Sequence, residues 1–193
     1  ELPKWPCQSA TAGDFDNDTD VDLFLVCTNP VDNSADLLLE NDGNGNFTAH
    51  EQPGGHQGRG NQVSSADFNR DGFIDLAVTN GNGAPPFAEG GSLQLLQNNG
   101  NENAWIEIDL HGTQSNADGM GAIVTLSSAG KQQIRLQDGG IHSFSQDHQR
   151  IHFGLGDAET VDTLRIRWPS GAVQVLKDIP ARQVLSVSES NAQ

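Results

Sequence analysis

One acidic motif occurs twice in this chain, and it constrains the fold more than any other feature. Positions 1, 3, 5 and 9 of each copy carry side-chain oxygens, from Asp14, Asp16, Asp18 and Asp22 and, 53 residues later, from Asp67, Asn69, Asp71 and Asp75. Ca²⁺ takes six to eight oxygen ligands at about 2.3–2.6 Å. Without a cation, so many carboxylates in one turn would repel one another. The spacing therefore predicts two calcium sites.

Each loop offers a further ligand at position 7, where we expect the main-chain carbonyls of Asp20 and Phe73 to point at the cation. The sharp turn at position 6 suits Gly72 in the second copy. Thr19 occupies that position in the first copy, so we expect a strained turn there. The alternative is a solvated acidic turn without metal. Two copies of the motif, each with four side-chain oxygens at the same positions, argue against this alternative.

The residues after each loop distinguish these sites from EF-hands. Position 12 of an EF-hand loop is a bidentate Glu, whereas this chain has Leu25 and Val78. Residues 21–27 and 74–79 are short, apolar and β-branched, which is typical of buried strands. The sequence thus predicts calcium loops that lead into a sheet.

The duplication extends beyond the loops. Residues 38–46 resemble residues 95–103, now at an offset of 57, and a Gly- and Pro-rich loop at 80–91 absorbs the difference. A period of about 50 residues with several strands per unit is typical of propeller blades. The acidic motifs and the turn "NDGNGNF" resemble FG-GAP/VCBS repeats over residues 8–103. This resemblance implies calcium-bearing blades of the integrin type, from which Thr19 and Asn69 are departures.

The rest of the chain predicts a β-sandwich. Alternating strands separated by polar or Gly-containing turns are expected at 105–110, 122–126, 133–136, 163–168, 173–176 and 183–187. The motifs "SNADGMGAIV", "SFSQDHQRIHFGLG" and "IRWPSG" resemble the ASPIC/UnbV domain over about 104–188. That domain follows FG-GAP/VCBS repeats in the cartilage acidic protein family and in many secreted bacterial proteins, and the resemblance implies no catalytic residues. We predict an all-β chain with two propeller-blade-like calcium-binding repeats and a C-terminal β-sandwich.

Charge is distributed unevenly and sets the expected domain boundary. The chain has 26 acidic and 10 basic residues and a formal charge of −16, which argues against nucleic acid or an anionic membrane as partner. Residues 1–103 hold 16 acidic and 3 basic residues, and residues 104–193 hold 10 and 7. We therefore expect two domains, 1–103 and 104–193. No stretch approaches the roughly 20 apolar residues of a membrane span.

Cysteines and calcium chemistry both suggest an extracellular location. Cys7 and Cys27 are expected to form a disulfide, with a buried free thiol at Cys27 as the alternative. The sequence has no initiator Met and no signal peptide, which suggests a mature or excised form. Simple sites of this kind suit millimolar calcium outside the cell. We expect a secreted or cell-surface protein.

The histidines and serines give little support for catalysis. His148 and His152 have the spacing of a helical zinc pair but lie in a strand-like segment, where about 13 Å would separate them, so surface or turn roles are expected. Ser143 and Ser145 lie near Asp147 and His148 only in sequence. We expect a non-catalytic protein for extracellular adhesion or scaffolding, which associates with itself or binds a protein or glycan. The alternatives are a self-assembling subunit of a fibre or surface layer, through an N-terminal arm at residues 1–6, and an accessory module of a secreted enzyme.

Overall fold

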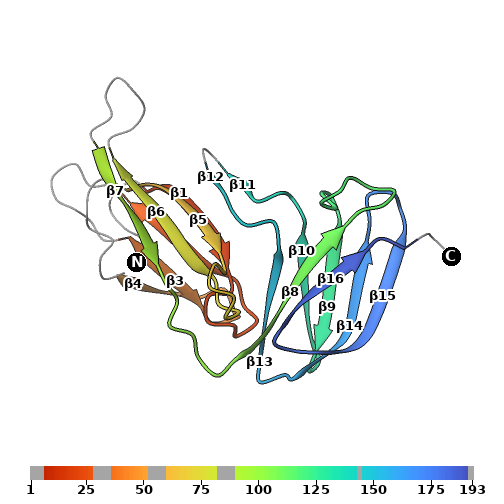
Figure 1. Ribbon diagram of the computed structural model, residues 1–193. Coiled ribbons are helices and arrows are strands. Elements are labelled where there is room, and N and C mark those ends of the chain that lie inside the picture. Colours follow the sequence, from red (N-terminus) through yellow and green to blue (C-terminus); the bar gives the residue numbers. More distant parts are fainter. Residues whose placement is uncertain (1–6, 28–35, 52–59, 82–89, 143–144, 191–193) are drawn as a thin grey trace.

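The computed structural model describes residues 7–27, 36–51, 60–81, 90–142 and 145–190 (Figure 1). These residues form sixteen strands and no helix, which confirms the all-β class. Accordingly, the described part of the chain contains no helix that could cross a membrane. The N-terminal arm at 1–6 and residues 82–89 of the predicted Gly- and Pro-rich loop lie outside the described residues.

The first repeat forms a four-stranded antiparallel sheet. Its strands follow one another in chain order: β1 (Cys7–Gly13), β2 (Asp22–Cys27), β3 (Leu37–Asn41) and β4 (Phe47–Glu51). The first acidic loop joins β1 to β2, and the turn at 42–46 joins β3 to β4. Phe24 and Val26 alternate with more exposed residues along β2, so one face of this sheet is apolar.

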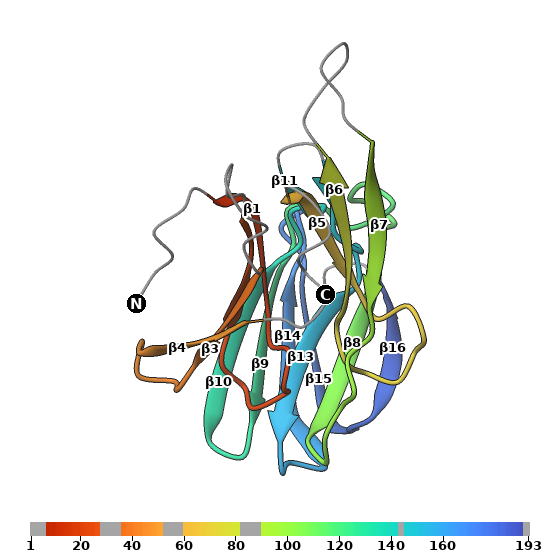
Figure 2. The same cartoon turned by 90° about the vertical axis from the view of Figure 1, so that its left-hand side faces the viewer.

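The second repeat begins in the same way but keeps only three strands together. They are β5 (Gly60–Ala66), β6 (Asp75–Gly81) and β7 (Gly90–Leu96), with the second acidic loop between β5 and β6. The two sheets lie side by side (Figure 2), and Phe24 and Val26 share a core with Val63 and Val78. After β7, the turn that corresponds to 42–46 leads into β8 (Ala104–His111), which joins other strands. The blade arrangement of a propeller stays a prediction.

The seven longer strands from Ala104 onward form two sheets that face one another across a single core. One sheet has the order β13-β8-β16 and the other the order β10-β9-β14-β15. The strands are β9 (Ile123–Ser128), β10 (Lys131–Leu136), β13 (Ile151–Gly156), β14 (Thr160–Arg167), β15 (Val173–Pro180) and β16 (Gln183–Ser188). Buried side chains from both sheets, with Trp168 among them, meet in this core. The predicted sandwich is therefore confirmed, and Trp168 is one of its core residues.

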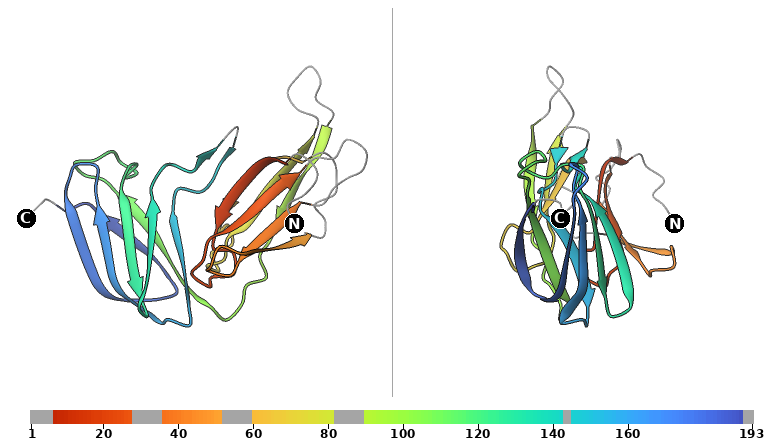
Figure 3. Two further views of the ribbon diagram at one scale, coloured as in Figure 1. Left: turned by 180° about the vertical axis from the view of Figure 1, so that it is seen from behind. Right: turned by 90° about the vertical axis from the view of Figure 1, so that its right-hand side faces the viewer.

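A small hairpin connects the sandwich to the second repeat. It consists of β11 (Ile141–His142) and β12 (Ser145–Gln146), and it extends from the sandwich toward β5 (Figures 1 and 3). The Ser145 hydroxyl donates to the Val63 carbonyl at 2.7 Å, and the His148 amide donates to the Ser65 carbonyl at 2.9 Å. These bonds cover the outer edge of β5, which would otherwise expose unpaired backbone groups.

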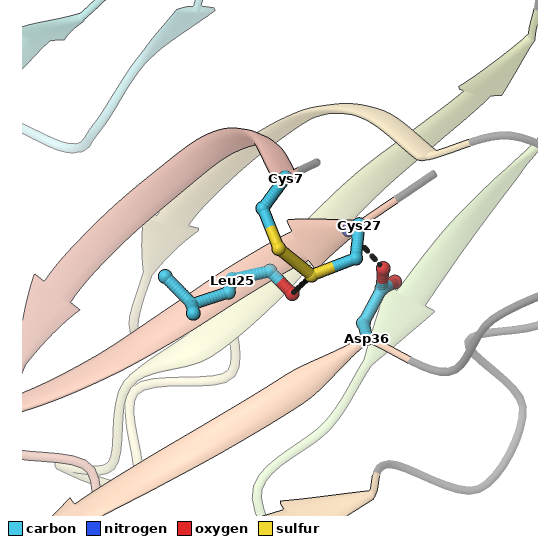
Figure 4. The surroundings of a disulfide bond; sticks show 4 residues. All are labelled: Cys7, Leu25, Cys27 and Asp36. Carbon is cyan, nitrogen blue, oxygen red and sulfur yellow. Dashed lines mark hydrogen bonds between the residues drawn. A yellow bond between two sulfur atoms is a disulfide. The ribbon is translucent and has the colours of Figure 1, made fainter. Parts of the chain in front are cut away.

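The predicted disulfide is present. Cys7 and Cys27 face each other across β1 and β2 and are bonded (Figure 4). The Cys27 amide donates to Asp36 Oδ1 at 3.0 Å, so the end of β2 is held from both sides. The alternative of a free thiol at Cys27 is excluded.

Candidate metal centre

Backbone amides shape the first acidic loop around its carboxylates. Asp14 Oδ1 accepts from the Asp18 amide at 2.9 Å, and Asp14 Oδ2 accepts from the Thr19 amide at 2.9 Å. Asp16 Oδ1 also accepts from the Asp18 amide, at 3.1 Å, and Asp18 Oδ1 accepts from the Asp20 amide at 2.9 Å. Each of these carboxylates thus accepts from amides that follow it in the chain, and the loop backbone curves around the side-chain oxygens.

Asp22, the first residue of β2, closes this loop. Its Oδ2 accepts from the Phe15 amide at 3.1 Å, and its Oδ1 accepts from the Asn41 amide at 2.9 Å. Asp22 is buried, as is Asp14 at the opposite end of the loop. The ninth position of the loop is therefore bonded to the backbone of the second position, next to Asp14.

The second loop reproduces this network bond for bond. Asp67 accepts from the amides of Asp71 and Gly72, at 3.1 and 2.8 Å. In the other four bonds a backbone amide also donates to a side-chain oxygen. The Asp71 amide donates to Asn69 at 3.1 Å and the Phe73 amide to Asp71 at 3.0 Å. The amides of Phe68 and Asn98 donate to Asp75 at 3.2 and 2.7 Å. The two motifs are thus equivalent in structure as well as in sequence.

Backbone angles confirm the expected strain in the first loop. Thr19 has φ of 91°, close to the 88° of Gly72 at the equivalent position. At position 4, Asn17 and Arg70 also match, with φ of 60° and 63°. A left-handed conformation costs a residue other than glycine roughly 1–2 kcal/mol. The turn is therefore the same in both loops, and Thr19 adopts it at a cost.

The first loop brings three carboxylates within reach of one ion. Oxygens of Asp14, Asp16 and Asp18 all lie within 4.8 Å of one another. In the part of the chain that the structure describes, this is the one group of three or more acidic, His or Cys side chains so close together. In the second loop an amide replaces one carboxylate, and Asn69 Nδ2 donates to Asp71 Oδ2 at 2.7 Å. The assignment of individual ligands, including the carbonyls of Asp20 and Phe73, stays a prediction.

Electrostatics show that these carboxylates are poorly placed in the absence of a cation. Burial, reinforced by the charge of Asp18, raises the pKa of Asp14 to about 8. Burial also raises the pKa of Asp22 to about 6, and it raises the pKa values of Asp16 and Asp75. Grouped oxygens that disfavour their own negative charge fit a divalent cation, which would remove the penalty. The donor set of hard oxygens matches calcium.

Sequence reasoning missed several asparagines that support the loops. Asn98 Nδ2 donates to the carbonyls of Phe15 and Ile74, at 2.7 and 3.2 Å. Nδ2 of Asn101 and of Asn103 both donate to the Asp16 carbonyl, at 2.6 and 2.9 Å. The repeated Asn- and Gly-rich segment was the available signal, but it indicated only a turn. These amides tie the end of the second repeat to the first loop.

Among the described residues, no group of three or more ligating side chains includes His148 or His152. His148 is exposed, and its Nδ1 accepts from the Arg150 amide at 3.1 Å, so a turn role is confirmed. The expectation of a surface or turn role is wrong for His152, because this residue lies within β13 and Nε2 lies 3.0 Å from the Gly72 carbonyl. Burial lowers the pKa of His152 to about 4, so its ring is neutral.

Ser145 and Asp147 take part in contacts between the two parts of the chain. Asp147 Oδ2 accepts from the Thr11 hydroxyl at 3.0 Å, and Asp147 Oδ1 accepts from the Ser65 amide at 2.6 Å. Ser145 binds the backbone of β5, as described above. These bonds hold β1, β5 and the segment around β12 together.

Comparison with known families agrees with this architecture. Residues 14–78 match the family model of the FG-GAP-like repeat, and residues 112–193 match the model named ASPIC and UnbV. The chain therefore carries an FG-GAP-like repeat followed by an ASPIC and UnbV domain.

The chain is also similar in sequence to Cartilage acidic protein 1 from three vertebrates. The chain is 28% identical over 176 residues to Cartilage acidic protein 1 of Xenopus tropicalis, which covers 87% of this chain. It is 27% identical over 192 residues to Cartilage acidic protein 1 of both Mus musculus and Homo sapiens, which covers 95% of this chain. The chain spans only 26% to 28% of the length of these relatives.

Proposed function

We propose that this protein binds two calcium ions and serves as a non-catalytic, extracellular adhesion or scaffold module. The observation that carries the proposal is the duplicated network of amides around side-chain oxygens, which collects three carboxylates within 4.8 Å in the first loop. The disulfide supports an oxidising compartment, since such bonds persist mainly outside the cytosol.

The proposed ligands follow the loop positions in both copies. The first site would use side chains of Asp14, Asp16, Asp18 and Asp22 with the Asp20 carbonyl, and the second would use Asp67, Asn69, Asp71 and Asp75 with the Phe73 carbonyl. The rigid network supports scaffolding rather than sensing, because the loops join strands of a sheet and lack the helix pair of a calcium switch.

Isothermal titration with calcium tests this proposal. The native chain should bind two ions, and Asp18→Ala and Asp71→Ala should each remove one. Asp162→Ala, at an exposed position on β14, is the matched control and should leave the stoichiometry at two. Normal stoichiometry in both loop variants would contradict the ligand assignment.

A second candidate function, self-assembly, is supported by one exposed surface. β7 is an edge strand, and its Leu93 and Leu95 are 67% and 63% exposed. Exposed apolar edge strands promote pairing with other chains. Sedimentation velocity should then show assemblies that Leu93→Ser with Leu95→Ser disperses. A native chain that sediments as a monomer at all accessible concentrations would contradict this candidate.

A further inference from the structure

The sandwich contacts both proposed calcium loops through a small set of residues. Within β13, Gly154 packs directly against the first loop, where a Cβ would overlap the Asp14 carboxylate and the Asn17 backbone. Two residues further, the Gly156 amide donates to the Asn17 carbonyl at 2.8 Å. Any side chain at residue 154 would therefore push β13 away from a predicted ligand.

The same strand reaches the second loop at the Gly72 carbonyl. His152 Nε2 lies 3.0 Å from this oxygen, and Asn17 Nδ2 of the first loop donates to it at 3.0 Å. The Trp105 ring of β8 covers Gly72 so closely that a Cβ there would overlap the indole. One carbonyl thus joins the first loop, the second loop and the sandwich.

A third contact comes from the start of β10. Lys131 Nζ donates to Thr19 Oγ1 at 2.7 Å and lies 3.5 Å from the Asp18 carbonyl. Thr19 is the strained residue of the first loop, and Asp18 supplies a predicted ligand. The sandwich therefore touches residues at, or next to, the predicted ligands of both sites.

We infer that calcium binding at the loops and docking of the sandwich through β13 are energetically coupled. A bound ion fixes the loop backbone, and the fixed backbone presents the carbonyls of Asn17 and Gly72 to β13. Because coupling between two equilibria is reciprocal, docking of β13 strengthens calcium binding as much as calcium strengthens docking. This inference rests on the proposed calcium function and adds to it a regulation of the same sites.

Two variants test the coupling in the full chain by isothermal titration with calcium. Gly154→Ala places a methyl group against Asp14 and should weaken binding at the first site. His152→Phe keeps a ring but removes the bond to Gly72, and it should weaken binding at the second site. Coupling of the usual size predicts a loss of affinity of about tenfold. His111→Phe, a partly exposed histidine at the end of β8, is the control and should bind normally.

Hydrogen exchange of the native chain tests the reciprocal effect without any substitution. Calcium should slow exchange of the Gly156 amide by about tenfold, because that amide is bonded to the first loop. The measurement also decides the question if either variant fails to fold.

The outcomes separate the two hypotheses. If the native chain binds no calcium, the proposed function fails. The coupling is wrong if the native chain binds two ions but neither test detects an effect. In that case the folded variants bind calcium with native affinity, and the Gly156 amide exchanges at the same rate with and without calcium. The contacts then only hold the two parts of the chain together.

Discussion

Removing calcium should make the stability of the protein fall as the pH rises above neutrality. Without the ion, burial and the charge of Asp18 raise the pKa of Asp14 to about 8, against about 3.9 in an unfolded chain. Between these values the folded state holds a proton that the unfolded state has lost, so stability decreases with rising pH. From about pH 7 to about pH 8.5, Asp14 alone should lower the free energy of unfolding by about 1 kcal/mol.

Asp22, His148 and His152, whose pKa values are also shifted, contribute little over this interval. Asp22, with a pKa of about 6, is already ionised at neutral pH in both states. The pKa values of His148 and His152 are lowered, so both rings are neutral in the folded protein, and above pH 7 they are mostly neutral in the unfolded chain as well. The expected slope therefore reports mainly on Asp14.

Urea unfolding followed by circular dichroism, in excess chelator and at both pH values, measures this slope. Saturating calcium should remove it, because the bound ion keeps Asp14 ionised. Asp14→Asn should remove it too, since the amide does not titrate. A calcium-free protein whose stability stays constant or rises over the interval would refute the reasoning, as would an unchanged slope in Asp14→Asn.

Three further predictions concern the elements that hold the repeats together. Chelation should lower the melting temperature, because each site at a hundredfold excess of calcium over Kd contributes about 2.7 kcal/mol, and magnesium should restore little since it demands a tighter octahedron; an unchanged melting curve would contradict this. Gly72→Ala should lower the free energy of unfolding by about 2 kcal/mol or more, because the position has a positive φ and its Cβ would overlap Trp105. Gly45→Ala, with φ of 82° and nothing near its Cβ, is the control and should cost only the backbone strain. Equal losses in urea unfolding would exclude the overlap. Reducing the bond between Cys7 and Cys27 should cost about 3 kcal/mol, measured by comparing melting with and without reductant, and a change within error would show that the bond is not stabilising.

Features set by local spacing could be predicted from the sequence. The acidic loops are turns of nine residues whose internal bonds join positions two to seven apart, so the pattern of oxygens fixes their shape. Thr19 illustrates this, since its positive φ follows from standing where the second copy has glycine. Strands with strict alternation, such as β9, were also predicted, because one face must enter the core.

Features that depend on distant pairing could not be predicted. The turn after β7 resembles the turn after β3, yet the strand that follows it, β8, pairs with β13 and β16 rather than with β7. Nothing local to that turn indicates the difference, because the partner strands lie 40 or more residues ahead in the chain. His152 was misjudged for the same reason, since its partner Gly72 lies 80 residues away. The boundary between residues 103 and 104 stays a prediction.

The two cores explain why calcium should matter for one part of the molecule more than for the other. In the described chain the sandwich core contains 17 buried apolar residues, whereas the core between the repeat sheets contains six. A core this small rarely stabilises a fold alone and usually needs disulfides or metals. The repeats have the Cys7–Cys27 bond, and the proposed calcium ions would supply the second kind of support. Removal of calcium should therefore loosen the repeats first and leave the sandwich folded, which residue-resolved hydrogen exchange would show as early loss of protection in β2 and β6 and continued protection in β9 and β14.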